Sequence, residues 1–391
     1  VIHFRIGGFN LLSHEGHNLT MIEFINDGLM TIFFLMVGLE IKRELLVGEL
    51  SSFRKAALPF IAACGGMVVP VVIYSMVCAP GTEGGQGLAI PMATDIAFSL
   101  GVLSLLGKRV PLSLKIFLTA FAVVDDIGGI LVIAIFYSSH VAYEYLLWAA
   151  LLYVLLYFIG KKGATNKIFF LVVGVVIWYL FLQSGIHSTI SGVILAFVIP
   201  AKPQLNVGTY IERIRRIIST FPEMGANNIV LTNQQIAKLK EVESASDRVI
   251  SPLQSLEDNL HGAVNYLVLP LFAFVNAGVM FSGEGEVMGG VTLAVALGLL
   301  AGKFLGIYSF TWLAVKSGLT PMPLGMNWKN ISGVALLGGI GFTVSLFIAN
   351  LSFGSAHPVL LNQAKLGVLS GTVMAGILGY LVLHWVLPKR R

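Results

Sequence analysis

The sequence predicts an all-α integral membrane protein formed by a single transmembrane domain over residues 1–391. Composition supports this class, because 56% of the residues are hydrophobic and only 12% are charged. The apolar runs are about 20 residues long, which matches helices that cross a bilayer and not the shorter alternating strands of a membrane β-barrel. Because lipid cannot satisfy exposed backbone groups, each run is expected to be helical.

Hydropathy and turn residues place eleven spans along the chain, near residues 24–41, 56–79, 88–107, 112–138, 142–160, 167–183, 187–200, 263–281, 287–315, 329–352 and 364–387. Lysines and arginines gather in the C-terminal tail and after the first, third, fifth, seventh and ninth spans, whereas the other side has only Arg5 and Lys365. The positive-inside rule therefore predicts a cytoplasmic C-terminus. An odd number of spans then puts Val1 outside, and we expect a first span, leading out from the cytoplasm, to be missing.

Two segments outside the spans have patterns of their own. Residues 1–12 alternate in hydropathy around Gly7-Gly8, which predicts an external β-hairpin whose free edge could form a homodimer contact. The connection 201–262 contains apolar residues at helical spacing beside arginines, which predicts an amphipathic helix at the cytoplasmic membrane surface: Ile211, Ile214, Ile217, Ile218 and Phe221. A positive-inside anchor is favoured over a regulatory role, and the rest of the connection is expected to be polar linker.

Four charged residues lie deep within predicted spans, away from the span ends. Asp125 and Asp126 fall near the middle of the apolar segment 116–137, where an ionised carboxylate costs at least ~2.5 kcal/mol. Asp95 and Lys303 lie in the third and ninth spans. Such charges usually mark ion or substrate pathways. The alternatives are an internally neutralised packing network for the aspartates and a purely structural counter-ion for Lys303.

Two predicted spans are expected to be broken. Pro91 should interrupt the third span, and the glycines Gly338, Gly339 and Gly341 should interrupt the tenth. Residues 56–138 and 287–388 then form two three-helix units of opposite orientation, each broken in its middle helix. Inverted repeats with broken helices are typical of secondary transporters, whose ion sites lie at the breaks.

The broken helices also give the four charges a role. Asp95 could offset the positive N-terminal ends of the half-helices, and Lys303 the negative C-terminal ends. Neighbouring residues on a helix point about 100° apart, so one of Asp125 and Asp126 can line an ion site while the other pairs with Lys303.

This arrangement suits a small hard cation. Carboxylates, the Thr94 hydroxyl and backbone carbonyls are oxygen ligands for such a cation, and protons would compete for the same carboxylate oxygens. Cation–proton exchange follows from that competition, with a small cation, protons and membrane lipid as partners. An intramembrane aspartyl protease is the alternative from another class, but Gly341 precedes Phe342 and not the aspartate of its Gly-x-Gly-Asp motif. A sodium-coupled symporter or a channel is a further alternative.

Other functional classes find little support in the residues. The polar loops lack a clustered basic patch with aromatics, so nucleic acid is not an expected partner. Cys64 and Cys78 lie in or at the ends of apolar runs and suggest neither a disulfide framework nor a cofactor. Glu40, Arg43 and Glu44 are expected to form an i,i+4 network at the cytoplasmic end of the first span.

Six motifs carry a resemblance to a known family: FFLMVGLEIKREL (33–45), ATDIAFS (93–99), VPLSLKIF (110–117), AVVDDIGG (122–129), LPLFAFVNAG (269–278) and LGGIGFTVSLFI (337–348). Together they resemble the NhaA family of sodium/proton antiporters, over the whole chain except residues 202–247. The resemblance implies a twelve-span antiporter of the bacterial inner membrane. It would export sodium or lithium in exchange for more protons and be driven by the membrane potential.

The resemblance also implies roles for individual residues. Asp126 matches the sodium-binding aspartate, Asp125 its neighbour that contacts Lys303, and Thr94 with Asp95 the pair at the broken helix. The groups linked to activation at alkaline pH are matched by Glu40, Arg43, Glu44, Glu257 and His261. The chain departs from the family pattern Glu-His-x-x-His, because it has Glu257-Asp258-Asn259-Leu260-His261.

Overall fold

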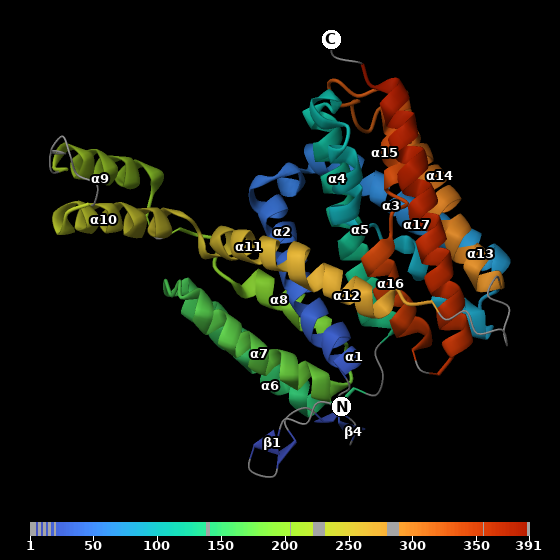
Figure 1. Cartoon of the computed structure of the whole chain (residues 1–391), viewed down its shortest axis with the longest axis horizontal. Helices are drawn as coiled ribbons and strands as arrows, with labels where there is room; N and C mark the ends of the chain where they lie inside the picture. The colour runs from blue at the N-terminus through green and yellow to red at the C-terminus, as the bar shows by residue number, and fades with distance from the viewer. Residues whose placement is uncertain are drawn as a thin grey trace.

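The computed structural model describes residues 5–6, 9–10, 13–14, 17–18, 21–137, 141–203, 205–221, 231–279, 289–354 and 356–388. The long helices gather into a bundle, with the N-terminus beyond one end and the C-terminus beyond the other (Figure 1).

Two short antiparallel strand pairs precede the first helix. β1 (Arg5–Ile6) pairs with β2 (Phe9–Asn10), and β3 (Ser13–His14) pairs with β4 (His17–Asn18). The expected turn at Gly7-Gly8 lies outside the described residues, and the second pair was not anticipated. A dimer contact through this segment stays a prediction.

Seven helical segments among the described residues are long and apolar enough to cross a membrane. Five are single helices: α3 (Phe53–Val77), α5 (Leu112–Phe136), α6 (Tyr143–Lys161), α7 (Lys167–Ser184) and α17 (Pro358–Val386). The other two contain a π-helical stretch: η1 (Phe24–Leu29) leads into α2 (Met30–Val47), and α13 (Gly290–Leu297) continues through η7 (Gly298–Gly302) into α14 (Lys303–Lys316). The predicted class of all-α membrane protein is confirmed.

Two broken helix pairs raise the number of candidate spans in the described part to nine. The first joins Glu83–Met92, which includes η3 (Glu83–Gly87) and η4 (Ile90–Met92), to α4 (Ile96–Ser104) with a bend of 46°. The second joins α15 (Trp328–Leu337) to α16 (Phe342–Phe353) with a bend of 45°. Both breaks fall where the proline and the glycine cluster predicted them. In chain order, each broken pair stands between two long helices.

The other two of the eleven expected spans are shorter or more polar than predicted. α8 (Thr189–Val198) has only 10 residues and packs closely on α2, since a Cβ at Gly192 would lie 2.5 Å from the Thr31 carbonyl oxygen. The span expected from residue 263 begins at Pro252, as α11 (Pro252–Ala263), η6 (Val264–Val268) and α12 (Leu269–Asn276), and its first part is polar. By length and composition, nine spans and not eleven are supported in the described residues.

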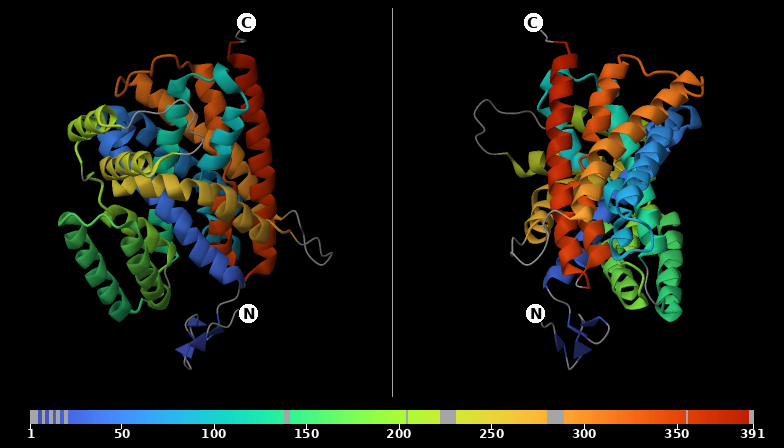
Figure 2. Two further views of the ribbon diagram at one scale, coloured as in Figure 1. Left: turned by 60° about the vertical axis from the view of Figure 1, so that its left-hand side comes forward. Right: turned by 90° about the vertical axis from the view of Figure 1, so that its right-hand side faces the viewer.

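The long connection between α8 and α11 forms a helical hairpin. α9 (Val207–Ser219) covers most of the predicted amphipathic segment, but α10 (Asn233–Val249) lies where polar linker was expected. That expectation was wrong because it overlooked the capping box that starts α10, in which Thr232 and Gln235 exchange side-chain-to-backbone hydrogen bonds. The hairpin projects sideways from the bundle (Figures 1 and 2).

Candidate functional site

The two broken helices meet at Asp95, whose side chain is 3% exposed. One carboxylate oxygen accepts a hydrogen bond from the backbone N–H of Phe98 in α4, and the other accepts one from the Thr343 N–H in α16. Each donor–acceptor distance is 3.1 Å. The Asp95 N–H donates to the Ile340 carbonyl at 2.6 Å, across the place where the two broken helices cross, which we call the crossing. A single carboxylate therefore caps the positive N-terminal ends of both half-helices, as the sequence suggested.

Hydroxyl groups, and not Lys303, occupy the opposite ends of these half-helices. Thr94 donates to the Gly338 carbonyl at 2.8 Å, and Ser99 donates to the Leu337 carbonyl at 3.0 Å. Ser345 donates to the Ile90 carbonyl at 2.8 Å, just before the first break. Ser99 and Ser345 were not singled out from the sequence, although a hydroxyl inside an apolar run beside a break is a usable signal.

The glycines of the second break allow its backbone to approach neighbouring helices. A Cβ at Gly339 would lie 2.4 Å from the Leu299 carbonyl oxygen, and one at Gly341 would lie 3.0 Å from the Ala93 carbonyl oxygen. At Gly338 it would meet the Ile307 side chain at 2.5 Å. Pro91, in η4, packs against Gly298 of η7 in the same crowded region. The breaks are therefore fixed by close packing as well as by hydrogen bonds.

Lys303 forms an ion pair with Asp125. Its Nζ lies 2.6 Å from Asp125 Oδ2, and both side chains are fully buried. The other oxygen, Asp125 Oδ1, is buried without a hydrogen-bond partner among the described residues. Such an orphaned carboxylate oxygen is costly unless something else compensates it.

Asp126 is 6% exposed, next to this pair on α5. The negative charges of Asp125, Asp95 and Glu40 act on its carboxylate, and the positive charge of Lys303 acts on it in the opposite sense. The buried charged side chains of the described residues are Asp95, Asp125, Asp126 and Lys303, so three carboxylates face a single lysine. The structure thus leaves negative charge in the interior that a cation or protons must balance.

The described residues contain no group of three His, Cys, Asp or Glu side chains that closes around a metal ion. Both oxygens of Asp95 already accept hydrogen bonds from the half-helix ends. Asp125 Oδ1 has no hydrogen-bond partner among the described residues, and no donor is seen at Asp126 there.

A second charged cluster lies at the Arg43 end of α2. Arg43 Nε is 2.9 Å from Glu257 Oε1, and its guanidinium is 3.4 Å from Glu44. Glu40 interacts electrostatically with all three of these groups. Burial raises the pKa of the Glu257 carboxyl above its ordinary value, whereas the nearby Arg43 acts to lower that pKa.

His261 stands apart from this cluster. Its ring is exposed and lies 3.2 Å from the side-chain amide of Asn265, one turn further along the same helix. The structure therefore brings together Glu40, Arg43, Glu44 and Glu257 but not the fifth predicted group.

A cavity of about 320 Å³ connects the cluster to α5, with a lining that includes Arg43, Glu44, Lys115, Thr119 and Ala120. Thr119 is two helical turns from Asp126 on α5, about 10 Å along the axis. The cavity therefore joins the charged cluster to the part of α5 that lies about two turns before Asp126.

Comparison with known proteins agrees with this geometry. The family model "Na+/H+ antiporter 1" matches residues 3–383. The chain belongs to this family. It is 99% identical over 390 residues to the Na(+)/H(+) antiporter NhaA of Bacteroides fragilis, covering 100% of the chain and 89% of the relative. The antiporter of the same name from Bacteroides thetaiotaomicron is 81% identical over 390 residues, with the same coverage.

A more distant relative extends the comparison. The Na(+)/H(+) antiporter NhaA 1 of Saccharophagus degradans is 46% identical over 367 residues, covering 93% of the chain and 79% of the relative. Membership of the family makes the protein a multi-pass membrane antiporter for Na⁺ and H⁺ and not an enzyme. The protease alternative is thereby removed.

Proposed function

We propose that Asp126 is the shared Na⁺ and H⁺ ligand of this antiporter, assisted by Asp125 Oδ1 and the Thr94 hydroxyl. The observation that carries the proposal is the unequal state of the two neighbouring aspartates. Asp125 is held by Lys303 at 2.6 Å, whereas no donor among the described residues bonds to Asp126. Asp95 holds the crossing in place and acts on the ion through its charge.

The exchange follows from competition for the same oxygens. Na⁺ binding at Asp126 displaces its proton, and a proton arriving from the other side displaces Na⁺. Na⁺ that also contacts Asp125 competes with Lys303 for that carboxylate, which links Lys303 to the cycle. We take it that the site can switch between the two sides of the membrane only while it holds Na⁺ or a proton. Movement of the broken-helix region then exposes the site to each side in turn, and the transport of one ion drives the transport of the other.

The remaining expectations concern direction and regulation. Cytoplasmic Na⁺ or Li⁺ enters through the cavity at Arg43 and leaves in exchange for a larger number of external protons, driven by the membrane potential. Glu40, Arg43, Glu44 and Glu257 set the pH response, with His261 outside their network. The protein lies in the bacterial inner membrane with its C-terminus in the cytoplasm. A homodimer forms through contacts of residues 1–12.

Proteoliposomes that contain no organic substrate test the assignment. An imposed Na⁺ gradient should drive protons in the opposite direction, as followed by an internal pH dye. Asp126→Asn should abolish that proton flux, while Glu144→Gln, which removes an exposed carboxylate at the start of α6, should not change it. Wild-type flux in the Asp126 variant would refute the ligand assignment. Proton movement in the same direction as Na⁺ would indicate a symporter instead.

A further inference from the structure

The α9–α10 hairpin is a packed unit away from the ion site. Ile217 of α9 and Ala245 of α10 are buried between the two helices. The Tyr210 hydroxyl lies 2.9 Å from Ser246 Oγ, and the Leu205 N–H donates to the Arg248 carbonyl at 3.0 Å across the base. These contacts fix which side of each helix faces its partner.

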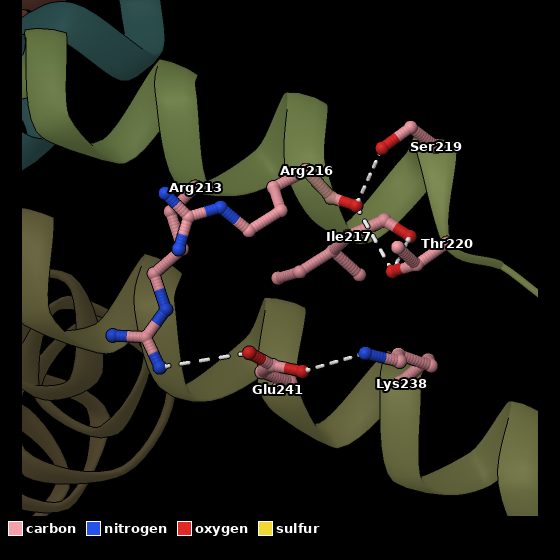
Figure 3. Close-up of polar contacts among 7 residues, drawn as sticks. All are labelled: Arg213, Arg216, Ile217, Ser219, Thr220, Lys238 and Glu241. Atoms are coloured by element: carbon pink, nitrogen blue, oxygen red, sulfur yellow. Dashed lines mark hydrogen bonds and ion pairs between the residues drawn. The ribbon is translucent and has the colours of Figure 1, made fainter.

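Ion pairs lie on one face of the hairpin. Arg213 of α9 is 3.8 Å from Glu241 of α10, and Lys238 is 3.3 Å from the other oxygen of the same carboxylate (Figure 3). Figure 3 shows this bridge spanning the gap between the helices. The two basic side chains of this face are therefore held by one shared carboxylate.

The opposite face is exposed and largely apolar. Steps of 100° per residue put Val207, Ile211 and Ile218 on one line of α9, turned away from Arg213. Because α10 runs antiparallel, the same rotation brings Ile236 and Leu239 to the same side of the hairpin, with the exposed Glu243 one turn further along that line. All five apolar side chains are exposed, Ile218 at 67% and Val207 at 65%. Monomeric proteins rarely leave such a patch in water, so something covers it.

Basic side chains border this apolar face. Arg215 lies beside the line on α9, and Lys240 lies on the outer edge of α10; both are exposed, and neither forms an ion pair in the described part of the chain. A helical surface with isoleucine and leucine on one side and unpaired arginine or lysine at its edge has the composition of an interfacial membrane element. In a contact between two copies, these edges would bring like charges together.

The base of the hairpin lies level with the end of a membrane span. Only Ile250 and Ser251 separate α10 from α11. Ser255 of α11 accepts a hydrogen bond from Lys167, the first residue of the candidate span α7, at 2.6 Å. Figure 1 shows the hairpin reaching outward past this end of α6 and α7. Lipid headgroups are therefore the surface nearest to it.

We propose that the apolar face of the α9–α10 hairpin docks on the adjoining leaflet of the membrane, with Arg215 and Lys240 on the phosphates of anionic lipids. The five exposed apolar side chains insert at the boundary between headgroups and acyl chains. The ion-paired face with Arg213, Lys238 and Glu241 stays in water. The proposal is independent of the ion site, so it stands or falls apart from the transport assignment.

Site-directed fluorescence on the full chain in nanodiscs tests the proposal. Cys64 and Cys78 are replaced by alanine, and an environment-sensitive dye is placed through Ile218→Cys on the apolar face or Thr209→Cys on the other side of α9. Discs are made from phosphatidylcholine alone or with phosphatidylglycerol, with a quencher on the lipid or in the water. We expect the dye at 218 to shift to the blue and to be quenched from the lipid, more strongly in anionic discs, and the dye at 209 to be quenched from water.

Charge removal gives a second measurement. Since each basic group near an anionic surface contributes about 1 kcal/mol, Arg215→Gln and Lys240→Gln should each lower the docked-to-undocked ratio in anionic discs by about fivefold. Equal quenching of both positions from water overturns the proposal. So does a blue shift that appears only in discs holding two copies, because it would assign the face to a second copy. A blue shift of the same size in wild type, Arg215→Gln and Lys240→Gln refutes the role of the anionic lipid.

Discussion

Asp95, at the start of α4, accepts a hydrogen bond from the backbone N–H of Thr343, at the start of α16, over 3.1 Å. The two residues are 248 positions apart in the chain. Their contact joins the two broken helices beside the proposed ion site, so the carboxylate that caps both half-helices also contributes its charge to that site.

Asp95→Asn should destabilise the protein, because a neutral amide compensates the two helix N-termini less well than a carboxylate. Losing charge-assisted hydrogen bonds at a buried position costs about 1.5–3 kcal/mol. The measurement is thermal unfolding in detergent, followed by tryptophan fluorescence. Ser370→Ala, which removes a hydroxyl that bonds only within α17, is the control and should melt close to wild type. Identical melting of all three proteins would argue against the capping role.

Lys303→Ala should lower stability strongly, because it leaves Asp125 buried without its partner. Breaking a buried ion pair by removing a single partner typically costs about 3–5 kcal/mol. The double change Asp125→Asn with Lys303→Met should regain most of that loss and still fail to couple Na⁺ to protons. Unfolding curves report the stability, and proteoliposome flux reports the coupling. If the single and double variants melt alike, the pair does not act as described.

Gly367→Ala should destabilise the contact between α17 and α13. A Cβ there would lie 2.7 Å from the Thr292 carbonyl oxygen, and overpacking of this kind costs about 1–3 kcal/mol. Gly376→Ala, on the same helix, is the matched control because its nearest neighbour would be at an ordinary 3.6 Å. The unfolding temperature should fall for the first variant and stay level or rise for the second. The reverse order would refute the close approach.

Arg43→Gln should shift the pH response to more alkaline values. Burial raises the pKa of Glu257, and Arg43 counteracts that rise. Without Arg43, Glu257 stays protonated to higher pH. The stability that the neutral carboxyl provides is present below its ordinary pKa and is lost as pH rises through the folded pKa, so the variant retains it over a wider range.

The pH midpoint of Na⁺-driven proton flux measures this shift. Arg54→Gln, which removes an exposed positive charge at the start of α3, is the control. A midpoint that moves to lower pH in the Arg43 variant, or moves equally in both variants, would contradict the role of the Arg43–Glu257 contact.

Much of the site was predictable because its signals are local. A charge inside an apolar run is visible from composition, so Asp95, Asp125, Asp126 and Lys303 could be found before any contact was known. The breaks were equally visible, since proline and clustered glycines disturb a helix wherever it packs. The bends of 46° and 45° lie where those residues stand.

The misses have a physical cause as well. α8 differs from the expectation only in being shorter, at 10 residues. The polar start of α11 was missed because hydropathy measures lipid preference, and a helix packed against other helices can be more polar than one facing lipid. The helix α10 was missed because its stability comes from capping and from packing on α9, and a polar sequence hides both. The role of offsetting the C-terminal half-helix ends was assigned to Lys303, although hydroxyl groups perform it, because only charged side chains were considered.

The sequence by itself determined the membrane class, the positions of the buried charges and the two breaks, because hydropathy and helix breaking depend on neighbours along the chain. The tertiary structure decided which groups meet. Lys303 pairs with Asp125 and not Asp126, across 178 positions, and Asp95 bridges both half-helices. These choices depend on the packing of helices distant in sequence, which leaves one aspartate compensated and its neighbour open.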